Sequence, residues 1–180
     1  MHRYVNLEKL EEFMTQVGRR ATTPGTLYVT GGSSALLLGI RDQTIDIDIK
    51  LDPEPGGVFE AIAELKILLS INVELASPDL FIPELPGWRD RSHWITTAGM
   101  VTFRHYDFYG QALSKIERGY RQDLSDATAL IQQGLIDKPE LVRLSEAIRL
   151  ELIRYPGIEP TMFYAKIEAF LVSKENDESN

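Results

Sequence analysis

The sequence predicts an α/β domain followed by a helical C-terminal half. Through residue 108, short apolar runs rich in β-branched residues alternate with amphipathic helical stretches, an order typical of layered α/β domains. From residue 109 onward, apolar residues recur only at helical spacing. We therefore expect an α/β core at residues 1–108, a helical region packed on it at 109–173, and a flexible tail at 174–180.

The α/β half opens with a helix and then alternates strands with helices. Asn6 is a suitable N-cap for a helix near 6–19, whose apolar residues share one face. Gly31 and Gly32 permit a tight turn between the first strand and a short helix. The remaining pattern predicts strands near 26–31, 44–51 and 71–76, and helices near 33–39 and 58–70.

The chain after residue 76 is expected to form a packed connection, a hairpin and a series of helices. Three prolines and a glycine make residues 77–91 irregular, and Gly99 suits the turn of a hairpin within 94–108. Helices are predicted near 109–118, 121–133, 138–153 and 160–173.

The composition limits the class of protein. The chain has 180 residues, 43% of them hydrophobic, which suffices for one main domain with a sizeable core. Cysteine is absent, so disulfides, thiolate metal sites and cysteine nucleophiles are excluded. We see no apolar signal core and no membrane-length apolar run, so we expect a cytoplasmic protein without a membrane partner. The formal net charge of −8 disfavours a broad nucleic-acid surface.

Two carboxylates stand one residue apart in a strand-like run. Asp46 and Asp48 alternate with isoleucines, so both side chains lie on one face of the strand. Adjacent ionised carboxylates repel each other, and a divalent cation relieves that repulsion. Oxygen ligands suit Mg²⁺, which completes its shell with water and substrate phosphates. The pattern indicates phosphoryl or nucleotidyl chemistry; the alternative is a solvated edge strand without a metal.

The glycine turn precedes these acids. Ser33 or Ser34 can cap the short helix that follows Gly31 and Gly32. Backbone N–H groups at such a turn can hold phosphate. The alternative is an ordinary strand-to-helix turn.

Gly31-Gly32-Ser33 followed by Asp46-x-Asp48 resembles the signature of nucleotidyltransferases of the DNA polymerase β superfamily. The likeness is greatest with AbiEii-type and related minimal bacterial nucleotidyltransferases, in which a helical lysine precedes a nearby acid. It covers roughly residues 25–135 and implies a polymerase β-like mixed-sheet core of the α/β (α+β) class. The helical part of the likeness contains Lys115, Arg118, Arg121, Asp123 and Asp126.

The resemblance implies metal-binding roles for the acids of the α/β half. Asp46 and Asp48 would be catalytic residues that hold Mg²⁺ or Mn²⁺. Glu74 is the candidate for a third metal ligand, by its place on the next strand. Asp107 competes with Glu74 for that role.

The resemblance also implies catalytic roles for Lys115 and Asp123. Lys115 would contact the triphosphate. Asp123 would orient Lys115 or Arg118, or would act as a base near the attacking hydroxyl. Eight residues separate Lys115 from Asp123, so they meet only if the helix breaks at Gly119. The implied nucleotide-binding residues are Gly31, Gly32, Ser33, Arg41, Lys115 and Arg118.

The expected activity is transfer of a nucleoside monophosphate from a nucleoside triphosphate such as ATP to an acceptor hydroxyl, with release of pyrophosphate. By analogy with the resembling proteins, a toxin-like or defence-associated role would add a cognate antitoxin as partner. A non-catalytic nucleotide-binding or antitoxin-like protein is one alternative, and a metal-dependent phosphohydrolase is another. The acceptor (protein, tRNA or small molecule), the base and the oligomeric state are left open.

Overall fold

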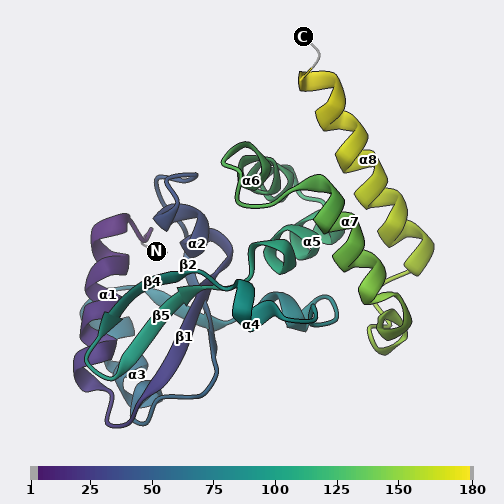
Figure 1. Cartoon of the computed structure of the whole chain (residues 1–180). Helices are drawn as coiled ribbons and strands as arrows, with labels where there is room; N and C mark the ends of the chain where they lie inside the picture. The colour runs from purple at the N-terminus through teal and green to yellow at the C-terminus, as the bar shows by residue number, and fades with distance from the viewer. Residues whose placement is uncertain (1–3, 179–180) are drawn as a thin grey trace. The chain divides into compact units, whose positions relative to one another are not determined.

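The computed structural model describes residues 4–178, with side chains described through residue 173. The chain forms two compact units, which can be followed by residue colour in Figure 1. The first unit comprises the residues up to Ser77 together with Ser92–Tyr106. The second comprises Pro78–Arg91 together with the residues from Asp107 onward. The segment 78–91 thus groups with the C-terminal helices and not with the strands that flank it in sequence.

A five-stranded mixed sheet forms the centre of the first unit, with strand order β3-β2-β1-β5-β4. β1 (Gly25–Thr30) pairs antiparallel with β2 (Asp46–Leu51) and parallel with β5 (Val101–His105). β3 (Asn72–Leu75) extends the sheet parallel to β2, and β4 (Trp94–Ala98) forms an antiparallel hairpin with β5. The predicted α/β class with a mixed sheet is confirmed.

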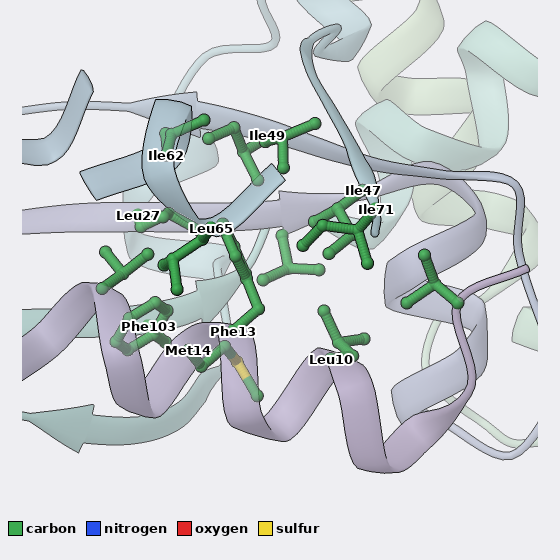
Figure 2. Close-up of a cluster of buried hydrophobic side chains, with 14 of the residues drawn as sticks. Leu10, Phe13, Met14, Leu27, Ile47, Ile49, Ile62, Leu65, Ile71 and Phe103 are labelled. Atoms are coloured by element: carbon green, nitrogen blue, oxygen red, sulfur yellow. The ribbon is translucent and has the colours of Figure 1, made fainter. Parts of the chain in front are cut away.

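Helices α1 (Leu7–Arg20) and α3 (Val58–Leu68) pack on one face of this sheet. As predicted, Asn6 caps α1, because its side chain accepts a hydrogen bond from the backbone N–H of Lys9 at 3.0 Å. The apolar faces of α1, α3 and the sheet are buried against one another, and removing this surface from water stabilises the unit. Figure 2 shows this core, whose buried residues include Leu10, Phe13, Met14, Leu27, Ile47, Ile49, Ile62, Leu65, Ile71 and Phe103.

The opposite face of the sheet is polar around β2. Strand register places Asp48 beside Thr30 of β1 and Glu74 of β3. Because side chains alternate along a strand, Ile47 enters the core and both aspartates project from the other face. The apolar pattern of β2 therefore decides the side of the sheet on which the candidate carboxylates lie.

The second unit is helical. Helix α5 (Phe108–Arg118) contacts α6 (Arg121–Gln132), α7 (Lys138–Ala147) and α8 (Pro160–Glu178). The helix expected at 138–153 ends at α7, and a 3₁₀ helix (Arg149–Arg154) follows it. None of the helices in the described part of the chain is long and apolar enough to cross a membrane.

Two segments expected to be irregular contain helix. A 3₁₀ helix (Pro78–Leu80) and the short α4 (Trp88–Arg91) lie within the packed connection. Helix α8 continues to Glu178, into the segment expected to be a flexible tail. Residues 179 and 180 of that expected tail lie outside the described residues.

Candidate functional site

Asp46 and Asp48 form the centre of the candidate site in the first unit. Both are partly exposed, whereas Ile47 between them is fully buried. Their one-residue spacing on a regular strand places the two carboxylates on the same polar face, as predicted. This pair is an oxygen-only donor set that water and a substrate can reach.

The glycine turn contacts one of these carboxylates. Gly31 begins helix α2 (Gly31–Leu37) with φ +58°, a conformation that disfavours any residue with a Cβ. A Cβ built on Gly31 would collide with Asp48 Oδ2. Glycine is therefore required at position 31 for two reasons: its backbone angle and the close approach of the turn to Asp48.

We expect Gly31→Ala to impair the site more than an ordinary glycine substitution does. Gly39 is the matched control, since its φ is +70° and no atom beyond its chain neighbours lies within 4 Å of the position its Cβ would take. Both variants should lose about 1 kcal/mol of unfolding free energy through backbone strain. Only Gly31→Ala should also weaken Mg²⁺-dependent nucleotide binding, by about 10-fold or more, because Asp48 must move. Equal binding by the two variants in calorimetric titrations would refute this role for the turn.

Arg41 lies at the same turn. A Cβ on Gly32 would lie 3.2 Å from Arg41 Nη1 and would collide with Thr44 Oγ1. The structure therefore places a partly buried cation against the second glycine, where the resemblance implies a nucleotide-binding arginine. Both Arg41 and the glycine turn belong to the first unit, together with the aspartate pair.

Ser33 has a different position from the one expected. Helix α2 starts two residues earlier than predicted, with Thr30 as its N-cap residue and no capping side-chain hydrogen bond. Ser33 is fully buried, and its Oγ donates to the backbone carbonyl of Asp46 at 3.1 Å. Thr44 Oγ1 donates to the same carbonyl at 3.2 Å. Ser33 thus helps to hold the start of β2 and is not exposed for a phosphate contact.

Ser34 is also not a cap, because it pairs with a buried histidine. Its Oγ lies 2.8 Å from His105 Nδ1, and both side chains are buried. Desolvation by burial, with a smaller contribution from the nearby His93, lowers the pKa of His105 from 6.5 to about 4. His105 is therefore a neutral structural residue at neutral pH.

The pKa of His105 predicts a loss of stability in acid. Between pH 6.5 and pH 4, the unfolded chain binds a proton at His105 that the folded protein excludes. Lowering the pH across this window should therefore reduce the free energy of unfolding by about 3 kcal/mol. His105→Gln should remove that part of the pH dependence, which denaturant titrations at several pH values measure. The same acid sensitivity in the variant would contradict the assignment.

Asn72 connects two acids of the polar face. Its Nδ2 donates to Asp46 Oδ1 and to Glu74 Oε1, both at 2.9 Å. The amide therefore orients the Asp46 carboxylate from the neighbouring strand. Asn72 was not among the predicted site residues, although its position two residues before Glu74 places it on the same strand face.

The two candidates for a third carboxylate ligand, Glu74 and Asp107, lie in different units. Glu74 lies beside Asp48 in the β2–β3 register, is exposed, and accepts a hydrogen bond from Asn72. Among the side chains described, through residue 173, no three histidine, aspartate or glutamate residues are grouped to hold a metal ion. Asp107 belongs to the second unit, where Arg91 donates from Nε at 3.2 Å and from Nη2 at 2.7 Å. Asp107 also caps α5 through Tyr109 N–H, so its carboxylate is already neutralised and bonded.

The Asp46 and Asp48 carboxylates form a donor set that fits Mg²⁺. This ion commonly binds through one or two carboxylates and takes its other ligands from water and substrate phosphates. Asp46 and Asp48 supply those two carboxylates. Because residue 31 is glycine, its backbone lies directly against Asp48, in space that a side chain at this position would fill. The site is thus suited to a metal that arrives with a phosphate ligand.

In the second unit, four charged side chains form the α5–α6 charge cluster (Lys115, Arg118, Asp123 and Asp126). Lys115 Nζ lies 2.6 Å from Asp126 Oδ2 and 3.7 Å from Asp123 Oδ1. Gly119 ends α5 with φ +72°, which lets α6 fold back so that Lys115 and Asp123 meet. The nearest partner of Lys115 is nevertheless Asp126, an acid to which no role had been given.

Three of the four side chains in the cluster are buried, and its two cations balance its two carboxylates. The side chains of Lys115, Asp123 and Asp126 are each less than 10% exposed, whereas that of Arg118 is 47% exposed. Arg118 Nε lies 3.2 Å from Asp123 Oδ2, an ion pair without hydrogen-bond geometry. Lys115 is thus held by two carboxylates, and Arg118 is the cation of the cluster that faces solvent.

Comparison with known proteins identifies the family. No curated protein and no solved structure matches the chain. One family does match, over residues 5–155, a range that contains the aspartate pair, the glycine turn and the α5–α6 charge cluster. The chain belongs to this family, which is described as "Nucleotidyltransferase of unknown function (DUF6036)".

Proposed function

We propose that this protein is a metal-dependent nucleotidyltransferase that moves a nucleoside monophosphate from a nucleoside triphosphate to an acceptor hydroxyl and releases pyrophosphate. The observation that carries the proposal is the pair Asp46 and Asp48 on one strand face, with the Gly31 backbone against Asp48. Membership of a nucleotidyltransferase family supports the same reaction class.

The residues of the first unit would act by binding and positioning. Asp46 and Asp48 would hold Mg²⁺ or Mn²⁺, which supplies Lewis-acid polarisation of the phosphate when bound. Asn72 would keep the Asp46 carboxylate oriented through its 2.9 Å hydrogen bond. Arg41 at the glycine turn would offset phosphate charge.

The residues of the second unit would have two kinds of role. Lys115 and Asp123 are buried, so they would act through position, by fixing α5 against α6. Arg118 is the exposed member of the cluster and would be the one to contact a nucleotide. This differs from the direct phosphate contact expected for Lys115, because two carboxylates already neutralise the lysine.

The biological role proposed for this activity rests on the sequence resemblance to AbiEii-type proteins. A toxin-like or defence-associated enzyme would modify a cellular protein, a tRNA or a small molecule, and a cognate antitoxin would restrain it. Growth arrest on expression of the wild type, but not of an Asp46→Asn variant, would support this role.

The test of the reaction uses each nucleoside triphosphate labelled at the α-phosphate, with Mg²⁺ and a bacterial extract as the source of acceptors. Transfer of label to protein, RNA or small molecules with release of pyrophosphate is the expected result, and chelation of the metal should stop it. Release of inorganic phosphate alone would indicate a phosphohydrolase instead. Neither label transfer nor pyrophosphate release would contradict the proposal.

A further inference from the structure

Two exposed aromatic rings flank Arg118 in the second unit. Phe81, just after the 3₁₀ helix Pro78–Leu80, is 42% exposed, and Tyr120, between α5 and α6, is 67% exposed. Arg118 Cζ lies 5.9 Å from the Phe81 ring centroid and 5.7 Å from that of Tyr120. Both distances are within the range of cation–π contact. Two chain segments, one around Phe81 and one at residues 118–120, thus bring two rings and a guanidinium together at the surface.

The guanidinium of this group is held in place. Asp123, whose side chain is 6% exposed, pairs with Arg118 Nε at 3.2 Å and so restrains the arginine. Asp123 in turn lies 3.7 Å from Lys115, so the arginine is tied to the buried part of the α5–α6 charge cluster. A restrained cation near two rings loses less conformational entropy on binding a ligand than a free surface arginine would.

Open space adjoins Arg118. The arginine lines a cavity of about 570 Å³ in the second unit, a volume within the usual range for small-molecule sites. Apolar residues such as Ile116, Leu124 and Phe170 form much of its wall. The polar residues along this wall are Arg118, Lys166 and Ser173, with no carboxylate among them. Both cations are paired with carboxylates, Arg118 with Asp123 at 3.2 Å and Lys166 with Glu117 at 3.1 Å, so the surroundings suit a flat, largely apolar group.

We propose that Phe81, Arg118 and Tyr120 form a stacking platform for a nucleobase. A base presents π faces that stack on aromatic rings and on arginine guanidinium planes. The inference rests on the proposed nucleotidyl transfer, which gives the protein a base-bearing ligand, and the platform itself lies wholly within the second unit. The base belongs either to the nucleoside triphosphate or to a single-stranded nucleic-acid acceptor.

The test compares full-length Phe81→Ala and Tyr120→Ala with wild type. Binding is measured by equilibrium dialysis with the four nucleoside triphosphates and Mg²⁺, with tripolyphosphate as a base-free probe, and with a single-stranded oligoribonucleotide. Each substitution should weaken binding of the base-bearing probe by about 5- to 100-fold and leave tripolyphosphate binding unchanged. Tyr120→Phe should retain binding, because the ring is preserved.

Phe59→Ala is the matched control, since Phe59 is 46% exposed and lies on α3 of the first unit. A loss confined to triphosphates or to the oligoribonucleotide supports the platform and identifies the source of the base. Unchanged binding of every base-bearing probe by both variants overturns it. If Asp46→Asn still abolishes Mg²⁺-dependent triphosphate binding in that case, the proposed function stands and the platform alone fails. If wild type binds none of the probes, both proposals fail.

Discussion

Asp46→Asn or Asp48→Asn is expected to lower Mg²⁺-dependent nucleotidyl transfer by about 10³-fold or more while the fold is retained. Each change removes one of two charges that would hold the metal, and a loss of about 4 kcal/mol in transition-state stabilisation corresponds to about 10³ in rate. Both side chains project from the polar face of β2 and are partly exposed, so neither contributes to the apolar core. Pyrophosphate release measures the activity, and circular dichroism verifies the fold.

The control for this result is Asp42→Asn. Asp42 is an exposed carboxylate in the connection between α2 and β2, outside the pair. Its variant should keep wild-type activity, which would show that lowering the net negative charge alone does not matter. Retained transfer in the Asp46 or Asp48 variant would refute the assignment of these residues as metal ligands.

Lys115→Met is expected to lower the free energy of unfolding by about 3–5 kcal/mol. The substitution leaves Asp126 and Asp123 buried without the ammonium that lies 2.6 Å from one and 3.7 Å from the other. An uncompensated buried charge is among the most destabilising changes in a protein interior. Denaturant titration followed by circular dichroism measures the effect.

Two further variants separate burial from charge pairing. Replacing both members of the closest pair, as Lys115→Met with Asp126→Leu, should recover most of the loss, because no buried charge of that pair then lacks its partner. Arg143→Met breaks the surface pair with Glu140, which is also 2.6 Å long and in the second unit, and should change stability by less than about 1 kcal/mol. A Lys115→Met protein as stable as wild type would show that the cluster does not hold α5 and α6 together.

Local signals in the sequence predicted much of the first unit. The one-residue spacing of Asp46 and Asp48 was enough to place both on one strand face, since alternation is a property of any strand. Asn6 was recognisable as a cap because its partner, Lys9, is three residues away. Gly99, with φ +54°, turns the β4–β5 hairpin where glycine was expected to do so.

Contacts between distant residues were not predictable in the same way. Ser33 looked like a cap or a phosphate contact, but its partner is the carbonyl of Asp46, thirteen residues along the chain. Asn72 is bonded to Asp46 across two paired strands, a relation that depends on strand order. The segment 78–91 joins the second unit through pairs such as Arg91 with Asp107, which the local sequence does not encode.

The most direct measurement is calorimetric titration of the wild type and the Asp46→Asn/Asp48→Asn double variant with each nucleoside triphosphate, with and without Mg²⁺. It requires no knowledge of the acceptor. We predict that the wild type binds at least one triphosphate in a Mg²⁺-dependent manner and that the double variant does not. Binding that is independent of Mg²⁺, or equal in the two proteins, would contradict a metal-dependent nucleotide site at Asp46 and Asp48.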